Sequence, residues 1–246
     1  YNISDQPWAV ENNNTWTNIG IASNEGEGDG IDNLPDNEYM RNELQKIYNS
    51  SLGIPYSEFY QGSLSSSNSD DNNYDESGNP TSSQVINQIN IGTPLLLYAG
   101  HADLISLSTS NISTDDSFSN FNKYFLGCFV GCMAGGHDED YLSLAEHFQT
   151  SSNSGSVGVF GSTILQSWEP PMHMQRELVN QIINADSVTT LGELFNNSVI
   201  SSEFKNSTRL DYFYYQIFGD PATRYILTLP ELRNQTSNQP EPAPEP

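Results

Sequence analysis

The stretches "LLLYAGHADL" (residues 95–104) and "FLGCFVGCMAGG" (residues 125–136) share one pattern. Each begins as a continuous apolar run and ends in a glycine followed by a residue that can carry chemistry, His101 in the first and Cys132 in the second. Continuous apolar runs, unlike alternating ones, are typical of parallel strands that are covered on both faces. In such sheets the functional residues lie at the carboxyl ends of the strands. The two stretches therefore predict a parallel sheet with His101 and Cys132 at the same end.

Strand-like and helix-like segments alternate along the rest of the chain. The helical segments are predicted at residues 37–48, 82–92, 141–149, 174–184 and 191–200. The strands are predicted at residues 17–23, 57–62, 94–100, 123–131 and 155–163, with a last strand after the turn at 219–221. This alternation predicts an α/β fold in which helices flank a mostly parallel central sheet.

The composition is strongly acidic, with 8 Lys plus Arg against 31 Asp plus Glu and a net charge of −23. Such a charge repels nucleic acid and anionic membranes, and it suits a salty or calcium-rich exterior. No apolar run reaches the roughly 18 residues of a membrane span, and no signal peptide opens the sequence. We therefore expect a secreted or cell-surface protein without nucleic-acid partners and without membrane insertion.

The 246 residues suffice for one α/β domain of ordinary size or for two small ones. We assign residues 1–229 to a catalytic domain or subdomain. Residues 230–246 are assigned to an acidic, Pro-rich linker that ends in "NQPEPAPEP". The sequence begins mid-stream at Tyr1, so we expect it to belong to a longer precursor with further domains.

The two cysteines, Cys128 and Cys132, are four residues apart in what reads as one strand. Their Cα atoms would then be about 13 Å apart, too far for a disulfide, which needs less than about 7 Å. Each follows a glycine and precedes x-x-Gly, so either could be a nucleophile. Cys132 is favoured because it closes the run, whereas Cys128 lies inside the strand, where it would pack as a small hydrophobic residue.

Five short motifs occur in order along the chain. They are "IASNEG" (21–26), "YAGHA" (98–102), "GCMAG" (131–135) with "LAE" (144–146), "STILQSWEPPM" (162–172) and "FGDP" (218–221). Together they resemble the gingipain family of cysteine peptidases, family C25, between Trp16 and Leu227. The family's preceding half-domain has no counterpart here. The resemblance implies a caspase-like three-layer sandwich and an extracellular cysteine endopeptidase that acts on peptides and proteins.

The resemblance also implies a role for individual residues. Cys132, at the family's spacing from Ala145 and Glu146, is the expected nucleophile. His101 would protonate the leaving amine and then activate water, and Glu25 would orient the histidine. Other candidates remain for two of these positions: His137, His147 and His173 for the histidine, and Glu27 and Asp29 for the carboxylate.

The backbone N–H groups of Cys132 and Ala102 correspond to the family's oxyanion hole. The family usually has glycine where this chain has Ala102. Alanine keeps the N–H group but loses the freedom to adopt a positive φ angle. This departure predicts an altered loop geometry after His101.

Trp168 and Met172 match residues that wall the substrate pocket in the family. Asp36 stands at the family's spacing after Glu25, and Glu169 is a second candidate for an acid in that pocket. A buried carboxylate would select an Arg or Lys side chain through a charge-assisted hydrogen bond. The predicted specificity is therefore cleavage after Arg or Lys.

The loops at residues 24–38 and 69–75 are dense in oxygen ligands that suit Ca²⁺, although neither has EF-hand spacing. Structural calcium is expected from the resemblance, and the cysteine chemistry itself requires no cofactor. Two alternative functions share this sequence pattern. One is a cell-surface transpeptidase of the sortase type that uses the same acyl-enzyme. The other is a catalytically inactive, calcium-stabilised module with a peptidase-like fold.

Overall fold

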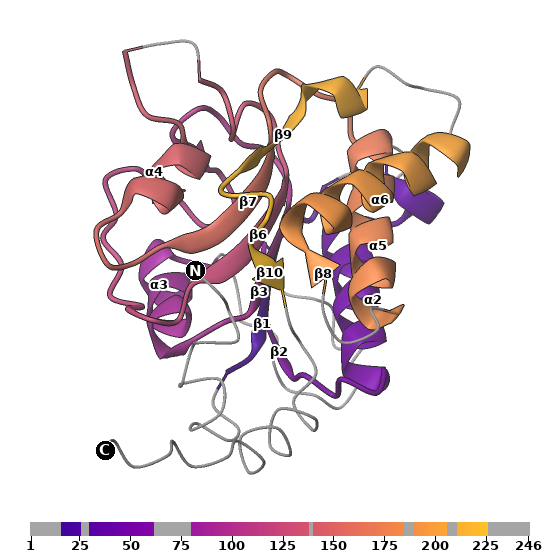
Figure 1. Cartoon of the computed structure of the whole chain (residues 1–246), viewed down its shortest axis with the longest axis horizontal. Coiled ribbons are helices and arrows are strands. Elements are labelled where there is room, and N and C mark those ends of the chain that lie inside the picture. Colours follow the sequence, from indigo (N-terminus) through magenta and orange to yellow (C-terminus); the bar gives the residue numbers. More distant parts are fainter. Residues whose placement is uncertain are drawn as a thin grey trace, which may run out of the picture.

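Six strands form the central sheet of the computed structural model, in the order β2-β1-β3-β6-β7-β9 (Figure 1). The structure describes residues 16–25, 30–61, 80–137, 140–184, 189–205 and 211–225. The first five strands in this order pair in parallel, and only β9 is antiparallel. The strands are β1 (Asn18–Ala22), β2 (Tyr56–Tyr60), β3 (Leu95–Ala99), β6 (Phe125–Val130), β7 (Ser156–Ser162) and β9 (Tyr215–Phe218). The predicted, mostly parallel sheet is thus confirmed.

Helices cover both faces of this sheet. On one face lie α2 (Asp36–Asn49), α5 (Glu169–Asn184) and α6 (Leu191–Lys205), and on the other lie α3 (Ser82–Ile91) and α4 (Leu144–Thr150) (Figure 1). Side chains of β3 alternate between the two cores: Leu95 and Leu97 pack on the side of α2 and α5, whereas Leu96 and Tyr98 pack on the side of α3 and α4. The three-layer α/β prediction is therefore confirmed.

Local sequence explains where several helices begin. Capping boxes start α3 and α4, formed by Thr81 with Gln84 and by Ser143 with Glu146. The predicted helix at 141–149 therefore begins only at residue 144. Helix α5 begins at Glu169, five residues before the predicted start, because prolines are tolerated in the first turn of a helix.

The C-terminal part of the sheet differs from the prediction. The edge strand β9 precedes the turn at residues 219–221 and follows the 3-10 helix η4 (Asp211–Tyr214). After the turn comes only the two-residue β10 (Arg224–Tyr225), which pairs with β8 (Thr189–Thr190). A small hairpin of β4 (Ser106–Leu107) and β5 (Ile112–Ser113) between β3 and β6 was also not predicted. These strands are too short to show a period of two in the sequence.

The strand order reverses between β1 and β3. From β1 the chain moves through α2 to β2 on one side, whereas from β3 it moves to β6 on the other side. Ligands of open α/β sheets bind at such a switch point, beyond the carboxyl ends of the strands. The segments that follow β1, β3 and β6 are therefore the place to look for a functional site.

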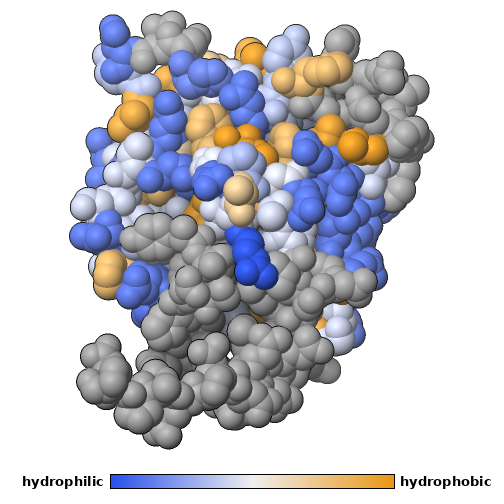
Figure 2. All heavy atoms as spheres, in the orientation of Figure 1, coloured by the Kyte–Doolittle hydropathy of each residue, from blue (hydrophilic) through white to orange (hydrophobic). Residues whose placement is uncertain are grey.

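On the face seen in Figure 2, hydrophilic side chains predominate and hydrophobic ones occur in small groups among them. Within the described ranges, no helix combines the length and the apolar character needed to cross a lipid bilayer. The short 3-10 helix η2 (Ile31–Asn33) precedes α2 and belongs to the segment that follows β1.

Candidate active site

Three neighbouring strands each end just before one of the predicted catalytic residues. Glu25 follows β1, His101 follows β3, and Cys132 follows β6. Adjacent strands are about 4.8 Å apart, so the outer two of these strands are separated by about 10 Å. His101 consequently comes from the middle strand, between its predicted orienting carboxylate and the predicted nucleophile.

His101 is paired with Glu25 across the switch point. Its Nε2 atom lies 2.9 Å from Glu25 Oε2, and the two side chains are 64% and 51% exposed. The other ring nitrogen, Nδ1, is the one left to exchange a proton with a substrate. The imidazole also faces the indole of Trp168, with ring centroids 5.1 Å apart and planes inclined by 41°. Carboxylate and indole together define the orientation of the imidazole.

Cys132 stands in a tight turn directly after β6. The next residue, Met133, has a left-handed backbone with φ of 55°, which is uncommon for a residue other than glycine. The thiol lies 3.5 Å from the Gln166 N atom and 3.8 Å from the Gln166 carbonyl oxygen. In the part of the chain that the structure describes, no hydrogen bond joins Cys132 Sγ to His101. In catalytic sites without substrate, the hydrogen bond between the nucleophile and its base is often long or poorly aligned.

Cys128 occupies a different environment in the middle of β6. It is fully buried, and both cysteines are free, as their spacing predicted. Burial raises the pKa of the Cys128 thiol to about 12, although a Gln175 contact acts in the opposite direction. A thiol with such a pKa carries almost no thiolate at neutral pH, so Cys128 is poorly suited to be a nucleophile.

The segments that carry the two predicted oxyanion donors are in contact at Gly131 and Ala102. A Cβ atom added to Gly131 would come within 2.8 Å of Ala102 Cβ, so glycine is required for this close approach. No backbone carbonyl of the described residues accepts a hydrogen bond from the N–H group of Ala102 or of Cys132. Ala102 has a negative φ angle. The expected conflict between alanine and a positive φ therefore does not arise.

Asp36, the predicted selectivity acid, is the first residue of α2 and is 1% exposed. Ser23 Oγ donates a hydrogen bond to Asp36 Oδ2, and the Asp36 N–H donates to the Glu25 carbonyl oxygen at 2.8 Å. The other carboxylate oxygen, Oδ1, is buried without a partner among the described residues. Burial raises the pKa of Asp36 from 3.8 to about 6; the Glu25 charge adds to the rise, while Ser23 and His101 oppose it.

The two predicted wall residues differ in exposure. Trp168 is half-buried against His101, whereas Met172 is fully buried and its carbonyl oxygen accepts a hydrogen bond from Tyr39 at 2.8 Å. Glu169, the second candidate acid, is 57% exposed and pairs with His173 at 3.3 Å. Of the two candidate acids, only Asp36 is buried beside the His101–Glu25 pair.

The alternative histidines lie elsewhere. His147 Nε2 contacts the Asp116 carbonyl oxygen at 3.0 Å on α4, and His137 Nδ1 lies 3.3 Å from the Gly135 carbonyl oxygen. His173 belongs to α5, as described above. The alternative carboxylates, Glu27 and Asp29, lie outside the described residues.

Sequence reasoning missed two residues that organise the site. Buried Gln175 of α5 donates through Nε2 to the Tyr98 carbonyl oxygen at 3.0 Å and to the Cys128 carbonyl oxygen at 2.9 Å, which ties α5 to both site-bearing strands. Ser23 holds Asp36, as noted above. An amide on the apolar face of a helix was the available signal for Gln175, and for Ser23 the available signal was its place in the "IASNEG" motif.

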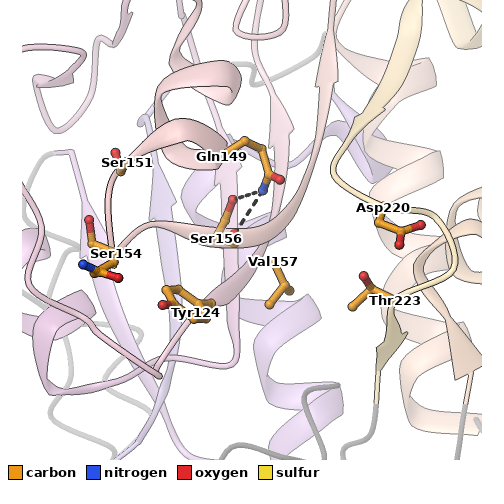
Figure 3. A pocket seen from close by; sticks show the side chains of 9 residues that line it. Tyr124, Gln149, Ser151, Ser154, Ser156, Val157, Asp220 and Thr223 are labelled. Atoms are coloured by element: carbon orange, nitrogen blue, oxygen red, sulfur yellow. Dashed lines mark hydrogen bonds between the residues drawn. The ribbon is translucent and has the colours of Figure 1, made fainter. Parts of the chain in front are cut away.

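No group of three or more His, Cys, Asp or Glu side chains within the described ranges could hold a metal ion. The predicted calcium loop at 69–75 and part of the loop at 24–38 fall outside those ranges, so the calcium prediction stays open. A cavity of about 440 Å³ opens at the opposite end of the sheet, near the starts of β6 and β7 (Figure 3). It is lined by Tyr124, Gln149, Ser151, Asn153, Ser154, Ser156, Val157, Asp220 and Thr223. This cavity is therefore separate from the candidate active site.

Comparison with solved structures shows where this fold occurs. A complex of Porphyromonas gingivalis RgpB pro- and mature domains matches with a TM-score of 0.72 and 21% identity, over 90% of this chain and 53% of the other. The Arg-specific cysteine proteinase gingipain R (RgpB) gives the same score and identity, over 90% and 52%. A third structure, described as a protease, gives 0.63 and 13% identity, over 90% and 52%. The chain thus spans about half the length of these proteins.

The sequence comparisons complete this picture. No curated protein sequence matches the chain significantly. The model of peptidase family C25, in contrast, matches residues 4–226, which is most of the chain. The fold, the order of the motifs and this match agree, and the chain belongs to peptidase family C25.

Proposed function

We propose that the chain is the catalytic part of an extracellular cysteine endopeptidase. One observation carries the proposal: three neighbouring parallel strands end at Glu25, His101 and Cys132, and His101 Nε2 is 2.9 Å from Glu25 Oε2. Of the two thiols, only that of Cys132 is partly exposed. Membership of peptidase family C25 supports the same chemistry. The net charge of −23 fits an extracellular setting.

The proposed reaction proceeds through an acyl-enzyme. The Cys132 thiolate forms a C–S bond to the scissile carbonyl carbon while the C=O π electrons move onto the oxygen. The N–H groups of Cys132 and Ala102 stabilise that oxyanion. His101 then gives a proton to the leaving amine, and the C–N bond breaks. In the second half, His101 takes a proton from water while the water oxygen adds to the thioester carbonyl carbon, and the C–S bond then breaks to release the acid product and the Cys132 thiolate.

We further propose cleavage after Arg or Lys. Asp36 supports this specificity because its Oδ1 atom is buried, unpartnered and close to the His101–Glu25 pair. A cationic side chain would lay its methylene groups against Trp168 and place its charge at the carboxylate. Because Asp36 is only 1% exposed, the substrate must uncover Oδ1 as it enters. Structural calcium in the acidic loops remains part of the same proposal.

Asp36→Asn is expected to reduce the preference for Arg over citrulline, its uncharged isostere, by about 30-fold. A factor of this size corresponds to a charge-assisted hydrogen bond of about 2 kcal/mol. Asparagine retains the shape and can still accept the Ser23 hydrogen bond. The measurement is kcat/KM for two peptide amides that differ only in Arg or citrulline before the cleaved bond. Glu169→Gln is the matched control and should keep the preference, because Glu169 is exposed and lies beside His173.

The same ratio is expected to depend on pH. Since the pKa of Asp36 is raised to about 6, the carboxylate is mostly protonated at pH 5 and mostly ionised at pH 7. The Arg-to-citrulline ratio should therefore rise with pH through about 6, and its rise should disappear in Asp36→Asn. Taking a ratio cancels any pH dependence of the chemical steps that the two substrates share. A ratio that stays flat from pH 5 to 8 in the wild type would contradict the assignment.

Product analysis tests the reaction class itself. The chain is incubated with a library of peptides and with an added amine acceptor, and the products are identified by mass spectrometry. Free carboxylic acid products that depend on Cys132 support an endopeptidase. Amine-linked products would favour a transpeptidase, and the absence of both would favour an inactive module.

A further inference from the structure

Tyr98 is a buried tyrosine three residues before His101 whose hydroxyl the reaction described above does not use. Its side chain is fully buried at the end of β3. The hydroxyl donates a hydrogen bond to the carbonyl oxygen of His101 and accepts one from the Thr109 N–H at 3.4 Å. Thr109 Oγ1 lies 3.3 Å from the same hydroxyl. Burial raises the pKa of Tyr98 to about 12, so the phenol keeps its proton and remains a donor.

The peptide unit between His101 and Ala102 is held on its carbonyl side. The His101 carbonyl oxygen accepts hydrogen bonds from the Tyr98 hydroxyl and from the Ser108 N–H, the latter at 3.0 Å. The peptide is trans, so its C=O and N–H bonds point in opposite directions. Fixing the carbonyl of His101 therefore also fixes the direction of the Ala102 N–H.

That N–H points away from the β4–β5 hairpin. Ala102 forms an isolated antiparallel bridge with Leu107, but the bonds of the bridge are made by the neighbouring residues. They run from Ser108 N to the His101 carbonyl oxygen and from Asp103 N to the Ser106 carbonyl oxygen, each at 3.0 Å. The N–H group of Ala102 is thus left outside the bridge, and the Cβ atom of the same residue packs against Gly131, the residue before Cys132.

Gly100 shows that the hydroxyl has little room. A Cβ atom added to Gly100 would lie 2.9 Å from Tyr98 Oη and 3.0 Å from Thr109 Oγ1. The backbone before His101 therefore packs directly on the tyrosine hydroxyl. The "YAGH" motif thus contains the buried donor Tyr98, the glycine Gly100 that leaves room for the Tyr98 hydroxyl, and His101, whose carbonyl oxygen accepts the hydrogen bond from that hydroxyl.

We propose that Tyr98 is a positioning residue that aims the Ala102 N–H at the oxyanion formed when Cys132 attacks a substrate. The inference rests on the proposed cysteine peptidase function and adds a determinant of its rate. Tyr98 does not touch the substrate; it acts through the peptide between His101 and Ala102. Removing its hydroxyl leaves the nucleophile, the histidine and the side-chain pocket in place, so the effect should be confined to stabilisation of the oxyanion.

Tyr98→Phe is the test, because it removes one oxygen and retains the ring. We expect kcat for a peptide amide to fall by about 10- to 30-fold, less than the 10²–10³ for loss of a whole oxyanion donor, with KM changed less than twofold. Affinity for a peptidyl argininal, which forms a tetrahedral adduct with the thiol, should fall by the same factor as kcat/KM. Alkylation of Cys132 by iodoacetamide should not slow, because that reaction forms no oxyanion.

Tyr225→Phe is the matched control. Tyr225 is also buried, and its hydroxyl donates to the Pro94 carbonyl oxygen at 3.2 Å, at the end of the sheet far from His101. The two variants should lose similar thermal stability, but only Tyr98→Phe should lose kcat and aldehyde affinity. Thr109→Val offers a second approach if Tyr98→Phe folds poorly. It removes a hydroxyl that contacts Tyr98 Oη and should give a smaller effect of the same pattern.

The outcomes separate this inference from the proposed function. If the wild type neither cleaves peptides nor reacts at Cys132, the function itself is wrong. If the wild type is active and Tyr98→Phe behaves like Tyr225→Phe, only the role of Tyr98 is overturned. Equal losses of cleavage and of iodoacetamide alkylation would also overturn it, because they would indicate general disruption of the site. A shifted amide resonance of Ala102 in Tyr98→Phe would support the inference independently of activity.

Discussion

Replacing Cys132 by alanine is expected to lower kcat/KM for peptide cleavage by about 10⁴-fold or more, to the level left by binding and oxyanion stabilisation alone. The acyl-enzyme cannot form without the sulfur, and the second thiol cannot substitute for it. Cys128 is fully buried in β6, and its pKa is raised to about 12. The measurement is single-turnover cleavage of a peptide amide by purified wild type and variant.

Cys128→Ala is the matched control because it removes the other thiol from the same strand. It should keep most of the activity and lose some thermal stability, since it removes a buried sulfur from a packed core. At neutral pH, limited iodoacetamide should label Cys132 well before Cys128, because only Cys132 is partly exposed. Equal labelling of the two thiols in the folded protein, or full activity of Cys132→Ala, would contradict the assignment of the nucleophile.

The sequence made the core of the fold predictable because β3 and β6 are buried on both faces. Their continuous apolar runs end abruptly, and the ends carry His101 and Cys132. Glu25 is different, since one carboxylate among 31 acidic residues has no distinguishing local pattern. Its pairing with His101 depends on β1 lying next to β3, and the strand order is a property of the whole sheet. The resemblance to a family, and no local pattern, singled out Glu25.

Other features could not be predicted because they depend on contacts between distant segments. The Gln166 backbone reaches Cys132 Sγ across 34 residues, and Gln175 reaches the Tyr98 carbonyl across 77. The left-handed backbone at Met133 breaks the usual preference for glycine, so no sequence rule marks it. Asp36 is buried at the N-terminus of α2 beside Ser23, and that burial is the main cause of its raised pKa, with a smaller contribution from the Glu25 charge. The sequence thus predicted where the strands end. The contacts and burial of the residues at those ends, and the pKa values that follow, depend on the folded sheet.

His101→Ala is expected to lower kcat/KM by about 10³-fold, within the range for loss of general acid–base catalysis. The leaving amine would lose its proton donor, and water would lose its base. Because the His101 side chain is 64% exposed, added imidazole should enter the vacated space and restore part of the activity. Glu25→Gln should cost only about tenfold: it preserves the shape of the partner, and the pair lies in contact with solvent, where charge interactions are weak.

His173→Ala is the control that separates catalysis from the loss of any histidine–carboxylate pair. His173 Nε2 lies 3.3 Å from Glu169 Oε1, an arrangement similar to His101 with Glu25, but it occurs within α5 and not between strand ends. Its removal should leave kcat/KM within about twofold of the wild type, and imidazole should have no effect on that variant. If His101→Ala and His173→Ala lost activity equally, the position at the end of β3 would have no catalytic meaning. If only His101→Ala lost activity and added imidazole did not restore it, His101 would hold the site together without transferring the proton.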